Sequence, residues 1–134
     1  MMIWDPIRCC QVEATPEEKV RQKWILRMIG PLGYPKGLLA VEKDLSSFSS
    51  SNRRFDLLCY TPSKDGLSPL LLVECKASDM GKIAETQVFG YNETIQSPFV
   101  CVIQGESAKT FWREGDKIAS VPFLPTYIQL ISKL

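Results

Sequence analysis

The stretch that decides the fold spans residues 69–77 and reads PLLLVECKA. Its apolar part, residues 70–73, predicts a buried β-strand, which Glu74 and Lys76 close with one residue between them. Because side chains alternate between the two faces of a strand, Glu74 and Lys76 should point the same way. Charged side chains are rarely buried unless they pair or bind a metal ion. This strand end is therefore either a plain salt bridge or part of a functional site.

A second strand is predicted over residues 53–60, which read RRFDLLCY, and turn-forming residues separate it from the first. If a hairpin turn centres near Asp65, Asp56 lies opposite Glu74 and on the same face as Lys76. Directly paired side chains are ~4.5–5.5 Å apart, so the two carboxylates would repel each other. Lys76 would offset part of this repulsion. A divalent cation would offset the rest, because Mg²⁺ is commonly held by one or two carboxylates plus water.

Length and composition are those of one globular domain. The chain has 134 residues, of which 45% are hydrophobic and 23% charged. Its net charge is +1, so any contact with nucleic acid should come from a local patch. No apolar run approaches the ~20 residues of a membrane span, and no signal peptide is visible. We therefore expect a cytoplasmic protein without membrane contact, and the sequence leaves its oligomeric state open.

The residue types exclude several kinds of catalytic site. The chain has no histidine, which removes Ser-His-Asp and Cys-His catalysis and every histidine-containing zinc site. None of the five cysteines forms a CxxC pair, and Cys59, Cys75 and Cys101 lie in apolar runs predicted as strands. We expect these three to be buried free thiols of a protein in a reducing compartment.

A helix is predicted over residues 16–29, between a Thr-Pro start and a Gly-Pro stop. Glu18 would complete a capping box with Thr15, which is sufficient to explain its presence. A helical wheel places Glu17 on the apolar stripe. We therefore expect Glu17, rather than Glu18, to face the two strand carboxylates. The alternative is a surface role in which Glu17 contacts the helix dipole and Arg21.

The remaining elements complete a mixed sheet with helices on its faces. Further strands are predicted over residues 38–45, 99–104 and 109–113, helices over 83–96 and 127–134, and polar loops over 46–52 and 61–68. Residues 1–14 carry no periodic signal and are predicted as a docking arm or an edge strand, which leaves residues 15–134 as one domain. The order α-β-β-β-α-β-β indicates an α/β fold with a mixed β-sheet flanked by helices.

In this order the residues resemble the PD-(D/E)xK nuclease superfamily and its restriction-endonuclease-like fold. More closely, they resemble the N-terminal domain of the type I restriction enzyme R subunit. The matching stretches include TPEE (15–18), GYPK (33–36), RRFD (53–56), LVECKA (72–77), QVFGYN (87–92) and QG (104–105). The resemblance covers roughly residues 15–128. It departs from the family pattern at Phe55, where Pro is usual, and the 134 residues hold no ATP-driven DNA translocase, to which members are often fused.

The resemblance implies a role for each residue of the cluster. Asp56 and Glu74 would hold Mg²⁺ or Mn²⁺, with the backbone carbonyl of Cys75 as a further ligand. Lys76 would orient or activate the attacking water and stabilise charge on the phosphate. Glu17 would support the ligands or reach the metal through water.

Three further residues would support substrate binding. Gln87 and Tyr91 share a face of the second helix, and would position the region of Lys76 and the DNA backbone. Arg54 would assist in binding the substrate. The alternatives are that Tyr91 is a residue at the edge of the core and that Gln87 is solvated.

The sequence thus predicts a metal-dependent DNA endonuclease of a restriction–modification system, acting alone or with a separate translocase or specificity subunit. Metal-assisted phosphodiester hydrolysis needs no histidine. The alternative is a non-catalytic module for nucleic-acid binding or assembly that keeps the fold. The intact Asp56, Glu74 and Lys76 favour the nuclease, whereas the near-neutral charge and absent motor favour the module or dependence on a partner. A structural domain with a chance salt bridge is the third possibility.

Overall fold

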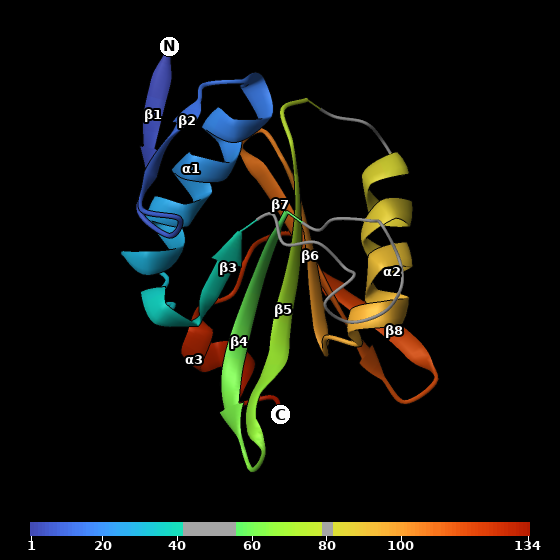
Figure 1. The fold of residues 1–134 in the computed structure, drawn as a ribbon. Coiled ribbons are helices and arrows are strands. Elements are labelled where there is room, and N and C mark those ends of the chain that lie inside the picture. Colours follow the sequence, from blue (N-terminus) through green and yellow to red (C-terminus); the bar gives the residue numbers. More distant parts are fainter. Residues whose placement is uncertain (42–55, 79–81) are drawn as a thin grey trace.

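The computed structural model describes residues 1–41, 56–78 and 82–134 (Figure 1). The elements in chain order are β1 (Met2–Asp5), β2 (Cys10–Glu13), α1 (Pro16–Ile29), the 3₁₀ helix η1 (Lys36–Leu38), β3 (Leu39–Val41), β4 (Leu57–Ser63), β5 (Gly66–Lys76), α2 (Ile83–Ile95), β6 (Phe99–Gln104), β7 (Ser107–Glu114), β8 (Lys117–Val121) and α3 (Tyr127–Ile131). The predicted order α-β-β-β-α-β-β is confirmed from α1 to β7. The predicted loop over residues 46–52 lies outside the described residues. Within the described ranges, no helix has the length and apolar character needed to cross a membrane.

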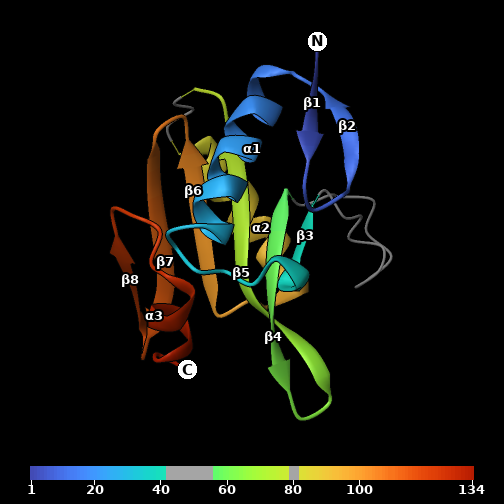
Figure 2. The same cartoon turned by 90° about the vertical axis from the view of Figure 1, so that its left-hand side faces the viewer.

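The main sheet has six strands in the order β3-β4-β5-β6-β7-β8. Its neighbouring strands are antiparallel except β5 and β6, which run parallel. A parallel pair needs a crossover connection over one face of the sheet, and α2 supplies it. In Figures 1 and 2, α1 and α2 lie on opposite faces of the sheet, with α3 on the side of α1. The predicted fold class, a mixed sheet flanked by helices, is confirmed.

Two cores hold β5 at the centre of this sheet. In the segments 57–59 and 71–75 of β4 and β5, odd-numbered apolar side chains face α1 and α3, and even-numbered ones face α2. Ile25 and Met28 of α1 pack in the first core, and Val88 of α2 packs in the second, all three without exposed surface. Burying one aliphatic side chain contributes roughly 1.5–3 kcal/mol, so both layers fix the position of β5. Burial on both faces also explains its continuous apolar run.

The predicted register of the β4–β5 hairpin is confirmed at the end that carries the charges. Leu57, the first residue of β4, pairs with Val73. Asp56 directly precedes β4, so it comes level with Glu74, the residue that follows Val73 in β5. The predicted pairing of the two strands therefore placed Asp56 correctly at the level of Glu74.

The turn of this hairpin is tighter than predicted. The strands continue through the expected loop over residues 61–68, and only residues 64 and 65 separate the paired Ser63 and Gly66. With this turn alone, Asp56 would come level with Val73. A β-bulge between Cys59 and Tyr60 shifts the pairing by one residue, which brings Asp56 level with Glu74 as predicted. The prediction placed the turn wrongly and missed the bulge, and the two errors cancel.

Residues 1–14 form an antiparallel hairpin, in which β1 and β2 make a sheet separate from the main one. In both ribbon views this hairpin lies beside α1 (Figures 1 and 2). Asp5 at the end of β1 has no exposed surface, although Met2 and Trp4 of the same strand are more than half exposed. The N-terminal segment is thus tied to the body of the protein by a buried acid.

The elements after β6 differ from the prediction in extent. β7 is longer than the predicted strand over residues 109–113, and α3 ends at Ile131 instead of the chain end. β8 was not predicted, because its side chains are exposed or half-buried at every position and give no apolar run. It lies at the edge of the main sheet and pairs with β7 on one side.

The three cysteines expected to be buried free thiols are buried and free. Cys59 lies in β4, Cys75 in β5 and Cys101 in β6, where their side chains belong to the core on the α1 side. Burial raises the pKa of Cys59 and of Cys101 to about 12, so both remain neutral thiols at physiological pH. These residues act as small core residues.

Candidate functional site

The candidate site lies at the carboxyl end of β5, where β4 begins and the first turn of α1 approaches (Figure 1). At such an end of the sheet, groups from both faces can meet. Asp56 comes from the bend before β4, and Glu74 and Lys76 come from the last residues of β5. Arg21 reaches the same place from α1.

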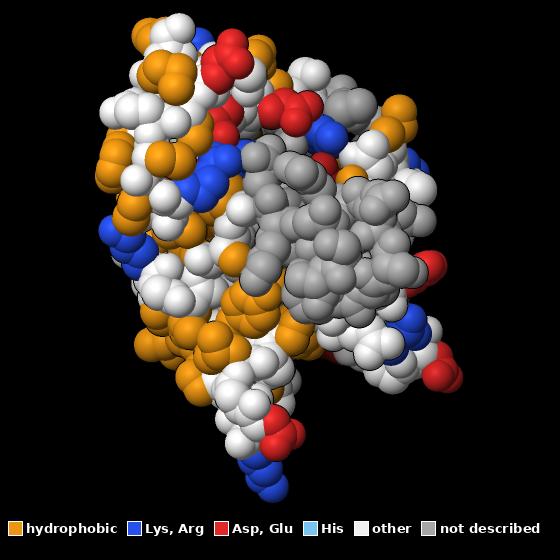
Figure 3. All heavy atoms as spheres, in the orientation of Figure 1, with side chains coloured by type: hydrophobic (Ala, Val, Ile, Leu, Met, Phe, Trp, Pro, Cys, Tyr) orange, Lys and Arg blue, Asp and Glu red, His pale blue; other side chains and the backbone are white. Residues whose placement is uncertain are grey.

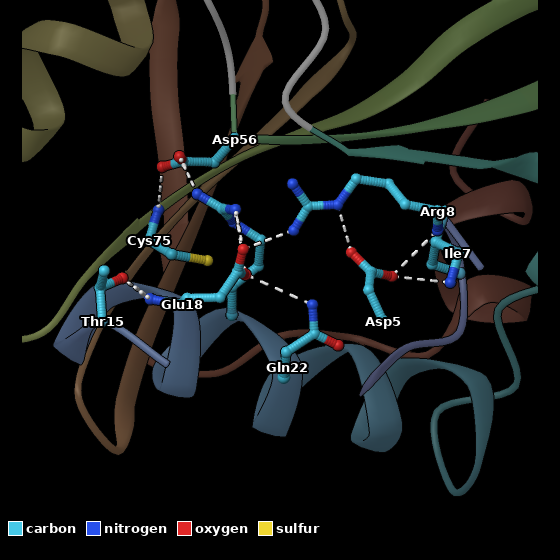
Figure 4. Close-up of polar contacts among 9 residues, drawn as sticks. Asp5, Ile7, Arg8, Thr15, Glu18, Gln22, Asp56 and Cys75 are labelled. Carbon is cyan, nitrogen blue, oxygen red and sulfur yellow. Dashed lines mark hydrogen bonds and ion pairs between the residues drawn. The ribbon is translucent and has the colours of Figure 1, made fainter. Parts of the chain in front are cut away.

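Asp56 is held by two donors of different origin. Its Oδ2 accepts the backbone N–H of Cys75 at 2.7 Å, and its Oδ1 accepts Nη2 of Arg21 at 2.9 Å. In Figure 4, the Asp56 carboxylate lies beside the backbone nitrogen of Cys75. Charge-assisted bonds of this kind are strong and directional, so they fix the carboxylate plane. Each oxygen of an ionised carboxylate has a second lone pair, so Asp56 can still bind a cation.

Glu74 is a buried carboxyl group whose two oxygens have different surroundings. The residue is 3% exposed, and Nζ of Lys76 lies 3.3 Å from its Oε1. Within residues 1–41, 56–78 and 82–134, no group donates a hydrogen bond to the buried Oε2. Burial, reinforced by Asp56 and opposed by Lys76, raises the pKa of Glu74 to about 8. A buried oxygen of this kind is costly unless a proton or a cation occupies it.

Lys76 carries its charge next to three acids. Its side chain is 13% exposed. Burial disfavours the charged form, but the carboxylates of Glu74, Glu17 and Asp56 outweigh burial and raise the pKa of Lys76. The group is therefore an ammonium donor at neutral pH.

The two glutamates in the first turn of α1 have different surroundings. Glu17 is exposed, so its predicted place on the buried stripe of α1 was wrong, but its charge still acts on Lys76. Glu18 is buried, and its carboxylate accepts Nη1 of Arg21 at 3.0 and 3.1 Å. Since Arg21 also bonds Asp56, Glu18 reaches the strand cluster through one side chain. The prediction that Glu17 faces the cluster missed this indirect link through Glu18.

The capping-box prediction is confirmed for only one of its two bonds. Thr15 Oγ1 accepts the backbone N–H of Glu18 at 3.1 Å. The backbone N–H of Thr15 donates to the carbonyl of Glu13, and the Glu18 carboxylate bonds Arg21, Gln22 and Arg8. Charge-assisted bonds to two arginines outcompete the reciprocal cap.

Three charged residues that contribute to this arrangement were missed at the sequence level. Arg21 was read only as a surface partner of Glu17. Its place on the helix, four residues before the fully buried Ile25, could have revealed it. Asp5 and Arg8 belong to the N-terminal hairpin, and no sequence pattern connects that hairpin to the strand cluster.

The backbone carbonyl of Cys75 lies on the correct side of β5 for its expected role. The N–H of Cys75 points to Asp56. In a strand, the N–H and C=O of one residue point to the same edge, so this carbonyl also faces the side of Asp56. The three expected oxygen ligands thus come from neighbouring positions.

The supporting residues expected on α2 are placed as follows. Gln87 is half-buried, and within the described part of the chain its buried Oε1 has no hydrogen-bond donor. Tyr91 is half-buried and packs against the core on the α2 side. Arg54 lies outside the described residues. The expected substrate contacts of Gln87, Tyr91 and Arg54 stay predictions.

A cation at this site would need ligands from outside the side chains. Among the residues that the structure describes, no group of three or more His, Cys, Asp and Glu side chains has the spacing of a metal site. Two carboxylates and one carbonyl leave the other positions to water or substrate oxygens, as is usual for Mg²⁺. The open Oε2 of Glu74 fits such an ion.

Charges of both signs are interspersed on the face drawn in Figure 3. The described part of this face has no broad field of Lys and Arg side chains. This distribution agrees with the net charge of +1. Any anionic polymer bound here would be held by local contacts.

Comparison with known proteins adds two findings. The family model for the N terminus of the type I restriction enzyme R protein matches residues 16–125. A solved fragment assigned to the HsdR subunit of a type I restriction enzyme from Vibrio vulnificus YJ016 has a similar fold, with a TM-score of 0.65 and 16% identity. The match covers 87% of this chain and 25% of that chain, so the protein spans a quarter of that relative. No curated protein matches the sequence.

Proposed function

Because the chain belongs to the family of type I restriction enzyme R protein N-terminal domains, we propose that it is the DNA-cleaving domain of a restriction–modification system. The proposed activity is Mg²⁺- or Mn²⁺-dependent hydrolysis of phosphodiester bonds by a PD-(D/E)xK site. Family membership supports the restriction context. The activity itself rests on the geometry at the end of β5.

The observation that carries the proposal is the pairing of Asp56 with a buried Glu74 whose Oε2 has no donor among the described residues. Two carboxylates in contact destabilise a protein unless something compensates their repulsion. Lys76 occupies only one oxygen of Glu74. A structural salt bridge explains only that oxygen, and the buried second oxygen needs a proton or a cation.

The side chains have separate roles in this proposal. Asp56 and Glu74 would hold the ion together with the carbonyl of Cys75. When bound, the metal would neutralise phosphate charge and lower the pKa of a bound water. Lys76 would turn from Glu74 toward the scissile phosphate and orient the attacking water, as a donor preorganised in a water-poor site. Glu17 would keep Lys76 protonated through its charge.

DNA is the proposed substrate, and Gln87, Tyr91 and Arg54 are proposed to contact or position it. A translocase or specificity subunit is proposed as a partner, because the family model describes the R protein of type I restriction enzymes. We place the activity in the cytoplasm, where cellular DNA would be accessible to a restriction enzyme.

A non-catalytic module for DNA binding or assembly is the second candidate. The interspersed charge on the face in Figure 3 favours the assembly role, because sequence-independent DNA binding usually uses a basic surface. In that case Asp56 and Glu74 would have only a structural role.

Cleavage of supercoiled and linear DNA distinguishes the two candidates. The protein is incubated with Mg²⁺, Mn²⁺ or EDTA, and the products are separated on agarose gels. We expect metal-dependent nicking that Asp56→Asn abolishes. Asp65→Asn, which changes an exposed acid at the far turn of the same hairpin, should leave cleavage intact. DNA binding without cleavage, at any metal concentration and with partner subunits added, would favour the non-catalytic module.

A further inference from the structure

A chain of alternating charges connects the N-terminal hairpin to the candidate site (Figure 4). Its members in spatial order are Asp5, Arg8, Glu18, Arg21 and Asp56. Asp5 anchors the chain, because its Oδ1 accepts the backbone N–H of Ile7 at 2.7 Å and that of Arg8 at 3.0 Å. The last bond of the chain ends on the Asp56 carboxylate.

Both arginines act as bridges. Arg8 donates from Nε to Asp5 and from Nη2 to Glu18. Arg21 donates from Nη1 to Glu18 and from Nη2 to Asp56. A guanidinium group is planar and rigid, so fixing one side of it orients the other. The orientation of the Asp56 carboxylate therefore depends on Arg8, which is connected to it through Glu18 and Arg21.

Burial makes these bonds different from surface ion pairs. The exposed fractions of the side chains are 4% for Arg21, 8% for Glu18 and 14% for Asp56. Arg8 is 24% exposed, and Asp5 is fully buried. Water screens such pairs only weakly, and removing one partner leaves a buried charge without compensation.

We infer that Arg8 and Arg21 are positioning residues for Asp56, and that the N-terminal hairpin is part of the scaffold of the site. The family match begins at residue 16 and does not include this hairpin. The consequence for cation binding rests on the proposed function. The orientation of Asp56 does not, and it can be measured without metal.

Positioning and simple electrostatics predict opposite effects on cation affinity. An arginine near a metal site repels the ion, so removing its charge should strengthen binding if charge alone matters. If the arginine holds Asp56 in a binding orientation, removing it should weaken binding. Loss of a group that orients a metal ligand typically lowers metal affinity roughly 10- to 100-fold.

The first experiment is a calorimetric titration with Mn²⁺ alone. Arg21→Gln should bind roughly 10-fold more weakly than the native protein, and Arg8→Gln should bind more weakly by a smaller factor. Arg8→Lys should restore part of the affinity, since an ammonium can replace one of the two bonds. Arg27→Gln is the matched control, because it removes one positive charge from the same helix at the exposed ion pair with Glu106.

The second experiment measures hydrogen exchange of the Cys75 amide by NMR in EDTA. This amide donates to Asp56, so Arg8→Gln and Arg21→Gln should accelerate its exchange, with Leu71 and Val73 in the same strand as internal references. Unchanged Cys75 exchange in both variants, or tighter Mn²⁺ binding in both, would overturn the positioning role. An effect of Arg21→Gln without an effect of Arg8→Gln would show that the hairpin does not help to position Asp56. Accelerated Cys75 exchange in both variants, together with no Mn²⁺ binding by the native protein, would overturn the proposed function and leave the positioning intact.

Discussion

Glu74 and Glu106 are the same kind of residue in opposite electrostatic situations. Glu74 is buried beside one cation and one acid, and burial raises its pKa to about 8. Glu106 is exposed and pairs with Arg27 and Lys23, which lower its pKa to about 2. Glu106 has more cationic partners, so a count of ion pairs would rank it as the more important residue.

The comparison shows that burial, and not the number of ion pairs, distinguishes the acid of the candidate site. Exposed pairs lose most of their energy to water and salt, whereas a buried acid retains the full effect of its neighbours. A strongly shifted carboxyl group beside a second carboxylate is also typical of functional sites. The following changes test this contrast, from the largest expected effect to the smallest.

Lys76→Ala should lower DNA cleavage by about 10²- to 10⁴-fold, the range typical of a positioned proton-transfer or donor group. Metal binding should persist, because Lys76 is not a ligand in the proposed site. Lys23→Ala, which removes a cation from Glu106, is the matched control and should cleave DNA normally. Cleavage rates and Mn²⁺ calorimetry measure both effects. Normal cleavage by Lys76→Ala would show that Lys76 contributes no more to cleavage than the exposed Lys23.

Glu74→Gln should change how the stability of the metal-free protein depends on pH. The folded-state pKa of about 8 lies above the ordinary 4.5 of an unfolded glutamate, so the folded state binds the proton more tightly. The resulting stability is complete below pH 4.5 and is lost as pH rises toward 8. The shift allows an upper limit of about 5 kcal/mol for this loss.

Urea unfolding in EDTA between pH 5.5 and 8.5 measures this loss. The native protein should become less stable across the range, and Glu74→Gln should remove most of the slope. Added Mg²⁺ should restore stability to the native protein at high pH. A native protein with constant stability across this range would show that Glu74 is an ordinary ionised acid.

Asp56→Ala and Glu74→Ala together should destabilise the protein less than the two single changes summed. Each single change removes a repulsive neighbour of the other carboxylate, and it also takes one acceptor from Arg21 or one anionic neighbour from Lys76. Coupling energies between residues in contact are about 0.5–3 kcal/mol. Thermal melts of the three variants and the native protein measure the coupling. Additive effects would mean that the two acids do not interact.

Glu106→Gln should have the smallest effect and leave the pH dependence between 5.5 and 8.5 unchanged. Its lowered pKa gives stability that is present above the ordinary value and lost only as pH falls toward 2, outside this range. The same urea series measures this outcome. A slope that changes as much as in Glu74→Gln would show that the two glutamates are equivalent.

Sequence reasoning reached the strand cluster because its information is local. The alternation of a strand and the spacing of a hairpin place Asp56, Glu74 and Lys76 together, and both depend on short stretches of chain. The same reasoning misassigned Glu18, because it centred the buried stripe of α1 on Trp24 and Met28 instead of Ile25. When the centre of the buried stripe moves by this much on the helical wheel, Glu18 changes from a capping residue to a buried residue.

The contribution of the N-terminal hairpin could not be predicted from the sequence. The contact between Arg8 and Glu18 depends on how a separate two-stranded sheet packs beside α1, and no periodic pattern records that packing. β8 was missed for a different reason, since an edge strand with few buried side chains needs no apolar pattern. Both errors concern tertiary contacts, not local propensity.

The β-bulge between Cys59 and Tyr60 also limits how this sequence can evolve. The turn at residues 64 and 65 lies at the far end of the hairpin from the two acids, and its side chains are exposed. Substitutions there should be nearly neutral. A single inserted or deleted residue would change the phase of β4 against β5 and move Asp56 away from Glu74, unless the bulge changed with it. In related sequences, we therefore expect length changes in this hairpin to come in pairs of residues or with a compensating change at the bulge.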